Sequence, residues 1–349
     1  KLEVVNEIGR IALELFVASE ARIVSNNAAT AANARVLQSM KESSERLKDL
    51  DTSIRNFQIS YSGAFTAALE NTGILSDRLR SIEELRNLVR ELQLVAITVQ
   101  NARSNSAVLI AGGKLKSVTG RIARNEYYKS NRSVNSIINV FSDKLAEYIK
   151  TQSVSLIRND DDSRNRAAAS GKEISNQLND LFQTLDQDTM LAREELSIAH
   201  NKQGSLFARS NSANSILLTN SELVALGLMV TGDTNRLFTL DSLAELNKLD
   251  SQISSLFTKI NERVALVESS LTNLNRSEEI KILHAAVASL ATIRNGIYSA
   301  DGIVTTLKKK LNAIEQADKS TDKLHTYVKI QATKGNENVS AVQVEQKRS

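Results

Sequence analysis

Two copies of one polar hexapeptide hold the side chains best suited to ligand chemistry. The string Ala-Arg-Ser-Asn-Ser-Ala occurs at residues 102–107 and again at residues 208–213. An arginine guanidinium presents a planar fork of donors that matches a carboxylate or another oxyanion, and an asparagine amide adds a donor and an acceptor. The candidate ligand-binding residues are Arg103, Asn105, Arg209 and Asn211. Polar contact between packed helices is the simpler interpretation of these side chains, and coincidence in a chain rich in Ala, Ser, Asn and Arg also explains the repeat.

Catalytic and metal-binding signatures are missing from the sequence. It contains no phosphate-binding loop, no Gly-x-Gly-x-x-Gly after a strand, no His-Glu-x-x-His and no nucleophile elbow. Cysteine is absent, and the three histidines His200, His284 and His325 stand too far apart for metal-ligand spacing. The acidic clusters at residues 160–162 and 194–195 are typical of a turn and a solvated helix face. We therefore predict a protein that is not an enzyme and that holds neither a cofactor nor a metal.

Composition favours helices and argues against a nucleic-acid partner. The 349 residues include no Pro, no Trp and only 4% aromatic residues, whereas proline ordinarily supplies about 5% of a chain. Without proline little interrupts a helix, and few aromatics suit narrow bundles packed with aliphatic side chains. The 44 basic and 40 acidic residues are interspersed and give a net charge of +4, which is typical of a solvated helical surface rather than a nucleic-acid footprint.

A membrane span is not expected within the chain itself. The best apolar run, Leu223–Gly232, falls well short of the roughly 18–20 residues that a span needs. The chain begins with Lys1 and shows no signal peptide, so we expect a processed or excised segment. Membrane attachment is expected only through flanking spans outside this chain.

Apolar and small residues recur at alternating steps of three and four, the pattern of a helical packing seam. The first seam comprises Leu85, Leu88, Leu92, Val95, Val99, Ala102, Ser106 and Leu109. The second comprises Ala286, Leu290, Ile293, Ile297, Ala300, Val304, Leu307, Leu311 and Ile314. A shorter third seam comprises Ile174, Leu178, Leu181 and Leu185. No stretch alternates with period two, so the sequence predicts no strands.

Helix breaks are few, and long segments lie between them. Glycine and polar clusters predict turns at residues 25–27, 61–63, 112–113, 159–162, 231–233 and 273–277. Capping-box patterns occur at Ser81 with Glu84 and at Ser242 with Glu245. We predict an elongated all-α protein in which residues 1–330 form two stacked antiparallel four-helix-type bundles that share long helices. Residues 331–349 are predicted to form a polar tail or linker towards a membrane span.

Several short motifs resemble those of a known group of bacterial receptors. They are Glu14-Leu15-Phe16-Val17-Ala18 in the first helix, the following Ser25-Asn26-Asn27, the string Asn220-Ser221-Glu222-Leu223 before an apolar helix, and a final long helix from about Ser277. Together they resemble the periplasmic sensor regions of TorS-type sensor histidine kinases of trimethylamine-N-oxide respiration. More loosely, they resemble the helical bimodular domains of chemoreceptors, and the likeness extends over most of the chain.

The resemblance implies a homodimer in the periplasm that binds a small anionic or polar ligand, or a periplasmic binding protein, at its membrane-distal part. It implies that the signal passes by small helix shifts to a cytoplasmic kinase or chemotaxis module outside this chain. We further expect the first and last helices to lie side by side, with both termini at one end.

Two other classes of protein remain compatible with the sequence. Low aromatic content and many Ser, Asn and Thr residues also suit a structural or assembly protein, such as a filament subunit, spacer or coiled-coil adaptor. A helical pore-forming toxin is a weaker fit, because the apolar runs at residues 108–113 and 223–230 are short for a membrane-entering hairpin.

Overall fold

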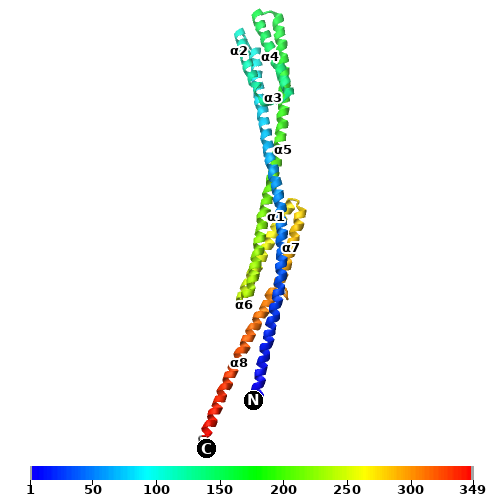
Figure 1. The fold of residues 1–349 in the computed structure, drawn as a ribbon. Helices are drawn as coiled ribbons and strands as arrows, with labels where there is room; N and C mark the ends of the chain where they lie inside the picture. Colours follow the sequence, from blue (N-terminus) through cyan, green and yellow to red (C-terminus); the bar gives the residue numbers. More distant parts are fainter. Residues whose placement is uncertain (1, 347–349) are drawn as a thin grey trace. The chain divides into compact units, whose positions relative to one another are not determined.

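The computed structural model describes residues 2–346, and every regular element in that range is a helix, so the all-α prediction is confirmed. The elements are α1 (Leu2–Gln100), α2 (Asn105–Ile122), α3 (Glu126–Ser130), α4 (Arg132–Arg158), α5 (Asp161–Arg236), the 3-10 turn η1 (Leu237–Thr239), α6 (Leu243–Asn273), α7 (Ser277–Tyr298) and α8 (Ile303–Gln346). Figure 1 shows their order along the chain.

The chain divides into two compact units. Unit 1 combines Lys1–Ser60 with Arg209–Ser349, and unit 2 is Tyr61–Ala208. Both boundaries fall inside helices: α1 has 99 residues and α5 has 76, and each contributes to both units. The sequence analysis did not place these boundaries, and no helix break marks either of them.

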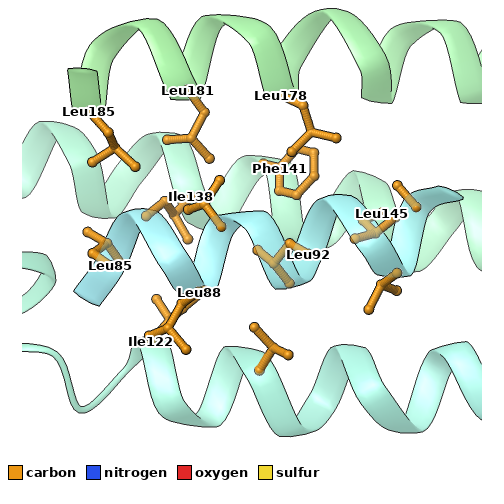
Figure 2. Packing of buried hydrophobic residues seen from close by; sticks show 14 of the residues in the cluster. Leu85, Leu88, Leu92, Ile122, Ile138, Phe141, Leu145, Leu178, Leu181 and Leu185 are labelled. Atoms are coloured by element: carbon orange, nitrogen blue, oxygen red, sulfur yellow. The ribbon is translucent and has the colours of Figure 1, made fainter. Parts of the chain in front are cut away.

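Unit 2 has a core to which four long helical segments contribute. Figure 2 shows Leu85, Leu88 and Leu92 of α1 facing the buried side chains of the neighbouring helices. The labelled partners from the other three helices are Ile122 of α2, Ile138, Phe141 and Leu145 of α4, and Leu178, Leu181 and Leu185 of α5. The third predicted seam and the first five positions of the first seam are therefore confirmed as core.

Unit 1 packs α6, α7 and α8 together with the N-terminal part of α1 and the C-terminal part of α5. The second predicted seam supplies its buried residues on α7 and α8, among them Leu290, Ile293 and Leu307. Helices α1 and α7 approach closely, because a Cβ added at Gly296 would lie 2.6 Å from Cγ2 of Val36. A side chain larger than hydrogen at position 296 would push that buried valine aside.

Four of the six predicted turns are wrong. Residues 25–27 and 61–63 lie inside α1, residues 112–113 inside α2 and residues 231–233 inside α5. A glycine inside a helix costs only about 1 kcal/mol relative to alanine, and the packing of a long apolar face outweighs that cost. The predicted turns at 159–162 and 273–277 do contain helix breaks, and Asn159 and Asn275 there adopt positive φ values of 55° and 57°.

The breaks that the sequence pattern missed are made by polar caps. Ser104, Asn125 and Asn131 begin α2, α3 and α4, each by accepting a hydrogen bond from a backbone N–H of the first turn. The helix start predicted at Ser242 is confirmed, because its hydroxyl accepts from the Glu245 N–H at 3.3 Å and caps α6. The one at Ser81 does not begin a helix, because residue 81 lies within α1.

Two predicted seams run across these breaks. The first continues past the end of α1, and its last two members, Ser106 and Leu109, are exposed rather than buried in the seam. The second crosses the turn at residues 299–302, which separates α7 from α8. Three-four spacing can persist by chance across a turn, so spacing alone does not show that one helix continues.

The C-terminal segment is helical, whereas the sequence predicted a polar tail or linker, and α5 contains an apolar window that the sequence analysis did not predict. Residues 331–346 continue α8 as an exposed helix, and residues 347–349 lie outside the described range. Among the described residues, the helical stretch Asp161–Thr239 holds an 18-residue window of mean hydropathy 1.4, of which 22% is buried, so by length and composition it could cross a membrane. The part of this stretch that belongs to unit 1 supplies buried Leu223 and Val230 to its core.

Candidate ligand-binding pocket

The two copies of the hexapeptide adopt different structures. Arg103 is exposed in the turn between α1 and α2, and Asn105 is the first residue of α2. The Asn105 side-chain oxygen accepts a hydrogen bond from the Ser153 hydroxyl of α4. Arg209 and Asn211 are exposed in the middle of α5, within unit 1. The structure therefore joins Asn105 to a neighbouring helix but does not make the two copies equivalent, and a ligand role for the four residues stays a prediction.

A pocket of about 590 Å³ opens in unit 2, and Gln100, two residues before the hexapeptide's first copy, lines it. It lies where α1 and α4 end and α5 begins, and its size falls in the usual range for small-molecule sites. Its lining includes the polar side chains of Gln100, Tyr148, Gln152, Asn159, Arg164 and Lys172. No metal-binding cluster of His, Cys, Asp or Glu occurs within residues 2–346.

The turn between α4 and α5 fixes one side of the pocket. Asn159 ends α4 in the left-handed conformation, and its N–H donates to the Ser155 carbonyl oxygen at 2.9 Å. Asp160 then caps α5, because its carboxylate accepts from the Ser163 N–H at 2.7 Å. This hydrogen bond lowers the pKa of Asp160 below its ordinary value. The two short-range contacts hold the turn in one conformation.

Tyr148 places a hydroxyl group in the pocket. Its ring is 3% exposed, and a Cβ added at Gly171 would lie 3.0 Å from the Tyr148 oxygen. A glycine at position 171 therefore leaves the space that the hydroxyl occupies. Burial raises the pKa of Tyr148, so the hydroxyl stays protonated near neutral pH and can donate a hydrogen bond. Within the described chain it makes no hydrogen bond to another residue.

The charged side chains of the pocket are all basic. Arg164 donates to the Asn159 carbonyl oxygen at 3.2 Å and forms an ion pair with Asp161 at 3.2 Å, so part of its charge is compensated. Lys172 forms no ion pair with any described residue, and the adjacent Glu173 pairs instead with Lys144 of α4. Among the described residues, no carboxylate lines the pocket. The charge of its lining therefore complements an anion.

Sequence reasoning identified the α4–α5 turn and the pocket's neighbour Asn105, but it missed Tyr148, Gly171 and Lys172. Tyr148 belongs to α4, whereas Gly171 and Lys172 belong to α5. Heptad spacing does not specify which residues face each other across a bundle. Two signals were available: Tyr148 is one of only six tyrosines, and Gly171 is an isolated glycine in a helical pattern.

No model of a known protein family matches the chain, and no curated protein matches it by sequence.

Proposed function

We propose that this chain is the extracytoplasmic sensing part of a bacterial transmembrane receptor, a two-component sensor kinase or a chemoreceptor, and that it has no catalytic activity of its own. In this proposal the protein lies in the periplasm, and its two units are helical bundles stacked along the shared helices α1 and α5. The observation that carries the proposal is the pairing of the first helix with the last.

The N-terminal part of α1 lies against the middle of α8 within unit 1. The Ser320 hydroxyl donates to a Glu14 carboxylate oxygen at 3.4 Å, and the Lys323 ammonium lies 3.9 Å from the same carboxylate. The N-terminal end of α1 and the C-terminal end of α8 extend from unit 1 in the same direction (Figure 1). A module inserted between two membrane-spanning helices needs this arrangement, because both connections must reach the same bilayer.

Helix α1 provides a continuous mechanical connection. Its residues 61–100 belong to unit 2 and its residues 2–60 to unit 1, without a helix break between them. A ligand or binding protein that favours one packing of unit 2 would change the position of α1, and the shift would reach the N-terminal end of the helix. The output would come from a domain outside this chain.

A second copy of the chain is the partner we propose for the exposed face of α1. Five apolar residues share that face, because pairs of them lie three, four or seven positions apart, and their exposed fractions run from 56% to 65%. They are Leu13, Phe16, Val17, Ile23 and Val24, and we call them the α1 stripe. A coiled-coil seam needs a partner with the same heptad phase, which a second copy supplies.

A chimeric receptor tests the sensing function. Residues 1–349 are inserted between the two membrane helices of a histidine kinase whose own sensor region has been removed, and autophosphorylation is measured in membrane vesicles. One and two alanines are then inserted in α8 after Lys334, each turning the helix by about 100° per residue relative to the kinase. We expect kinase output to change with each insertion, because α8 sets the orientation of the output helix. Output that is the same in all three chimeras would contradict the proposal.

The α1 stripe also suits the alternative, a structural or assembly protein. That class predicts open-ended association, since exposed seams then continue from one subunit to the next. Sedimentation velocity over a wide range of concentrations distinguishes the two: a sensor gives a closed dimer, whereas a filament subunit gives growing polymers.

A further inference from the structure

We propose that the pocket at the α4–α5 turn binds a short-chain hydroxycarboxylate, held by Lys172 and the Tyr148 hydroxyl. The inference rests on the proposed function in taking this pocket as the place where the sensing module meets its ligand. The binding itself is measurable without any receptor output. It differs from the sequence prediction, which placed the ligand at the two copies of the hexapeptide.

Lys172 selects the charge of the ligand. It is the basic side chain of the pocket that has no carboxylate partner among the described residues, whereas Arg164 already pairs with Asp161. One uncompensated positive charge matches one carboxylate. Lysine is a compact point charge on a flexible stem, so it can follow a carboxylate without the fixed fork geometry that arginine requires.

The neutral groups of the pocket select a hydroxyl-bearing chain. The Tyr148 hydroxyl is a donor without a partner among the described residues, and the side-chain amides of Gln100 and Gln152 can both donate and accept. Ala167, Ala168 and Leu156 supply the apolar part of the lining. A short carbon chain with a hydroxyl next to its carboxylate fits this lining. Its hydroxyl would hydrogen-bond to the polar side chains, and its carbon atoms would contact the apolar ones.

The absence of acidic residues from the lining excludes amino acids. An α-amino acid carries an ammonium group beside its carboxylate, and no carboxylate in the lining would balance that ammonium. Near Lys172 and Arg164 the ammonium would be repelled, and it would lose its hydration without compensation. The pocket should therefore separate a hydroxy acid from the amino acid of the same shape.

Four small probes of similar size test this selection by isothermal calorimetry and by thermal shift. They are lactate, its uncharged amide lactamide, L-alanine, and inorganic phosphate. We expect lactate to bind and to raise the melting temperature, because a ligand that binds only the folded state stabilises it. We expect lactamide and L-alanine to bind at least about tenfold more weakly, since each loses a charge-assisted hydrogen bond or gains an uncompensated charge.

Matched variants locate the binding site. Lys172→Gln should weaken lactate binding by about ten- to a hundredfold, because a hydrogen bond to a charged group is lost. Tyr148→Phe keeps the buried ring and should weaken binding by about three- to tenfold. Lys202→Gln, which alters an exposed lysine elsewhere on α5 in unit 2, should leave it unchanged. Circular dichroism melts of all three variants check that each one folds.

Each outcome supports or contradicts the inference. Equal binding of lactate and lactamide, or of lactate and L-alanine, contradicts selection by charge. Tighter binding of phosphate than of lactate contradicts the carboxylate class, and no lactate binding contradicts the inference outright. Unchanged lactate affinity in a folded Lys172→Gln variant places the site elsewhere. If lactate does not bind but the chimeric kinase still responds to helix insertions, the proposed function stands and the inference about this pocket is wrong.

Discussion

At the scale of single residues, Glu279 is a buried charge on which three segments of unit 1 converge. Glu279 is 4% exposed, accepts a hydrogen bond from Ser53 of α1 at 2.6 Å, and pairs with the Arg276 guanidinium. Arg276 in turn lies over the Phe57 ring, with its guanidinium carbon 4.6 Å from the ring centroid. The carboxylate thus joins the α6–α7 turn to α1.

Replacing this carboxylate should destabilise unit 1. We expect Glu279→Ala to lower the free energy of unfolding by about 1.5–3 kcal/mol, because hydrogen bonds to a charged group are lost and Ser53 and Arg276 keep no buried partner. Glu278→Ala is the matched control: its side chain is 75% exposed and pairs with Lys281, so it should change stability by less than about 0.5 kcal/mol. Chemical denaturation followed by circular dichroism measures both. Equal effects of the two substitutions would show that the buried cluster is not stabilising.

The same carboxylate predicts a dependence of stability on pH. Burial raises the pKa of Glu279, but the hydrogen bonds from Ser53 and Arg276 outweigh burial, and the net pKa lies below the ordinary value of 4.5. A pKa that is lower in the folded than in the unfolded state stabilises the protein at pH values above the unfolded-state pKa. This stabilisation is lost as the pH falls through the folded-state pKa. The melting temperatures of the unaltered protein and Glu279→Gln should therefore differ more at pH 7 than at pH 3. A difference that is constant across this range would contradict the assignment.

At the scale of elements, the turn between α7 and α8 depends on Gly302. A Cβ added there would lie 2.7 Å from the Ile297 carbonyl oxygen and 2.8 Å from the Ser299 nitrogen. Both are backbone atoms, so neither can move aside as a flexible side chain would. The Gly302 N–H also donates to the Ser299 carbonyl oxygen at 2.9 Å, which closes the turn.

A pair of glycine substitutions tests this turn. We expect Gly302→Ala to destabilise the protein by about 1–3 kcal/mol, the usual cost of overpacking. Gly335→Ala, within exposed α8, meets no atom within 4 Å and should be neutral or stabilise by up to about 1 kcal/mol, because alanine favours helix. Thermal unfolding compares the two variants. A Gly302→Ala variant as stable as Gly335→Ala would show that the turn relaxes without cost.

The sequence predicted the type of the elements better than their ends. Three-four spacing located the buried faces of α5, α7 and α8, because each apolar seam is a property of one helix. It placed turns at Gly112 and Gly232, where the helix continues, since packing of a long face outweighs a local preference. It missed the break at Ser104, where a single cap ends one helix and begins the next. The pocket was missed because it depends on which residues of α4 and α5 face each other.

At the scale of the whole molecule, the α1 stripe leads to the last prediction. Phe16 and Val17 are its central pair, 65% and 56% exposed, and in a dimer each would be buried against the second copy. Sedimentation equilibrium of Phe16→Glu should give a dimer dissociation constant at least about tenfold larger than that of the unaltered protein. Burying one large apolar side chain contributes about 1.5–3 kcal/mol, and the substitution removes this contribution. Leu218→Glu, at a 69% exposed leucine of α5 in the same unit, should not change the dimer. If neither variant alters association, the second copy does not cover this face. If the unaltered protein grows beyond a dimer as its concentration rises, the α1 stripe belongs to an assembly protein, and the sensing function fails with it.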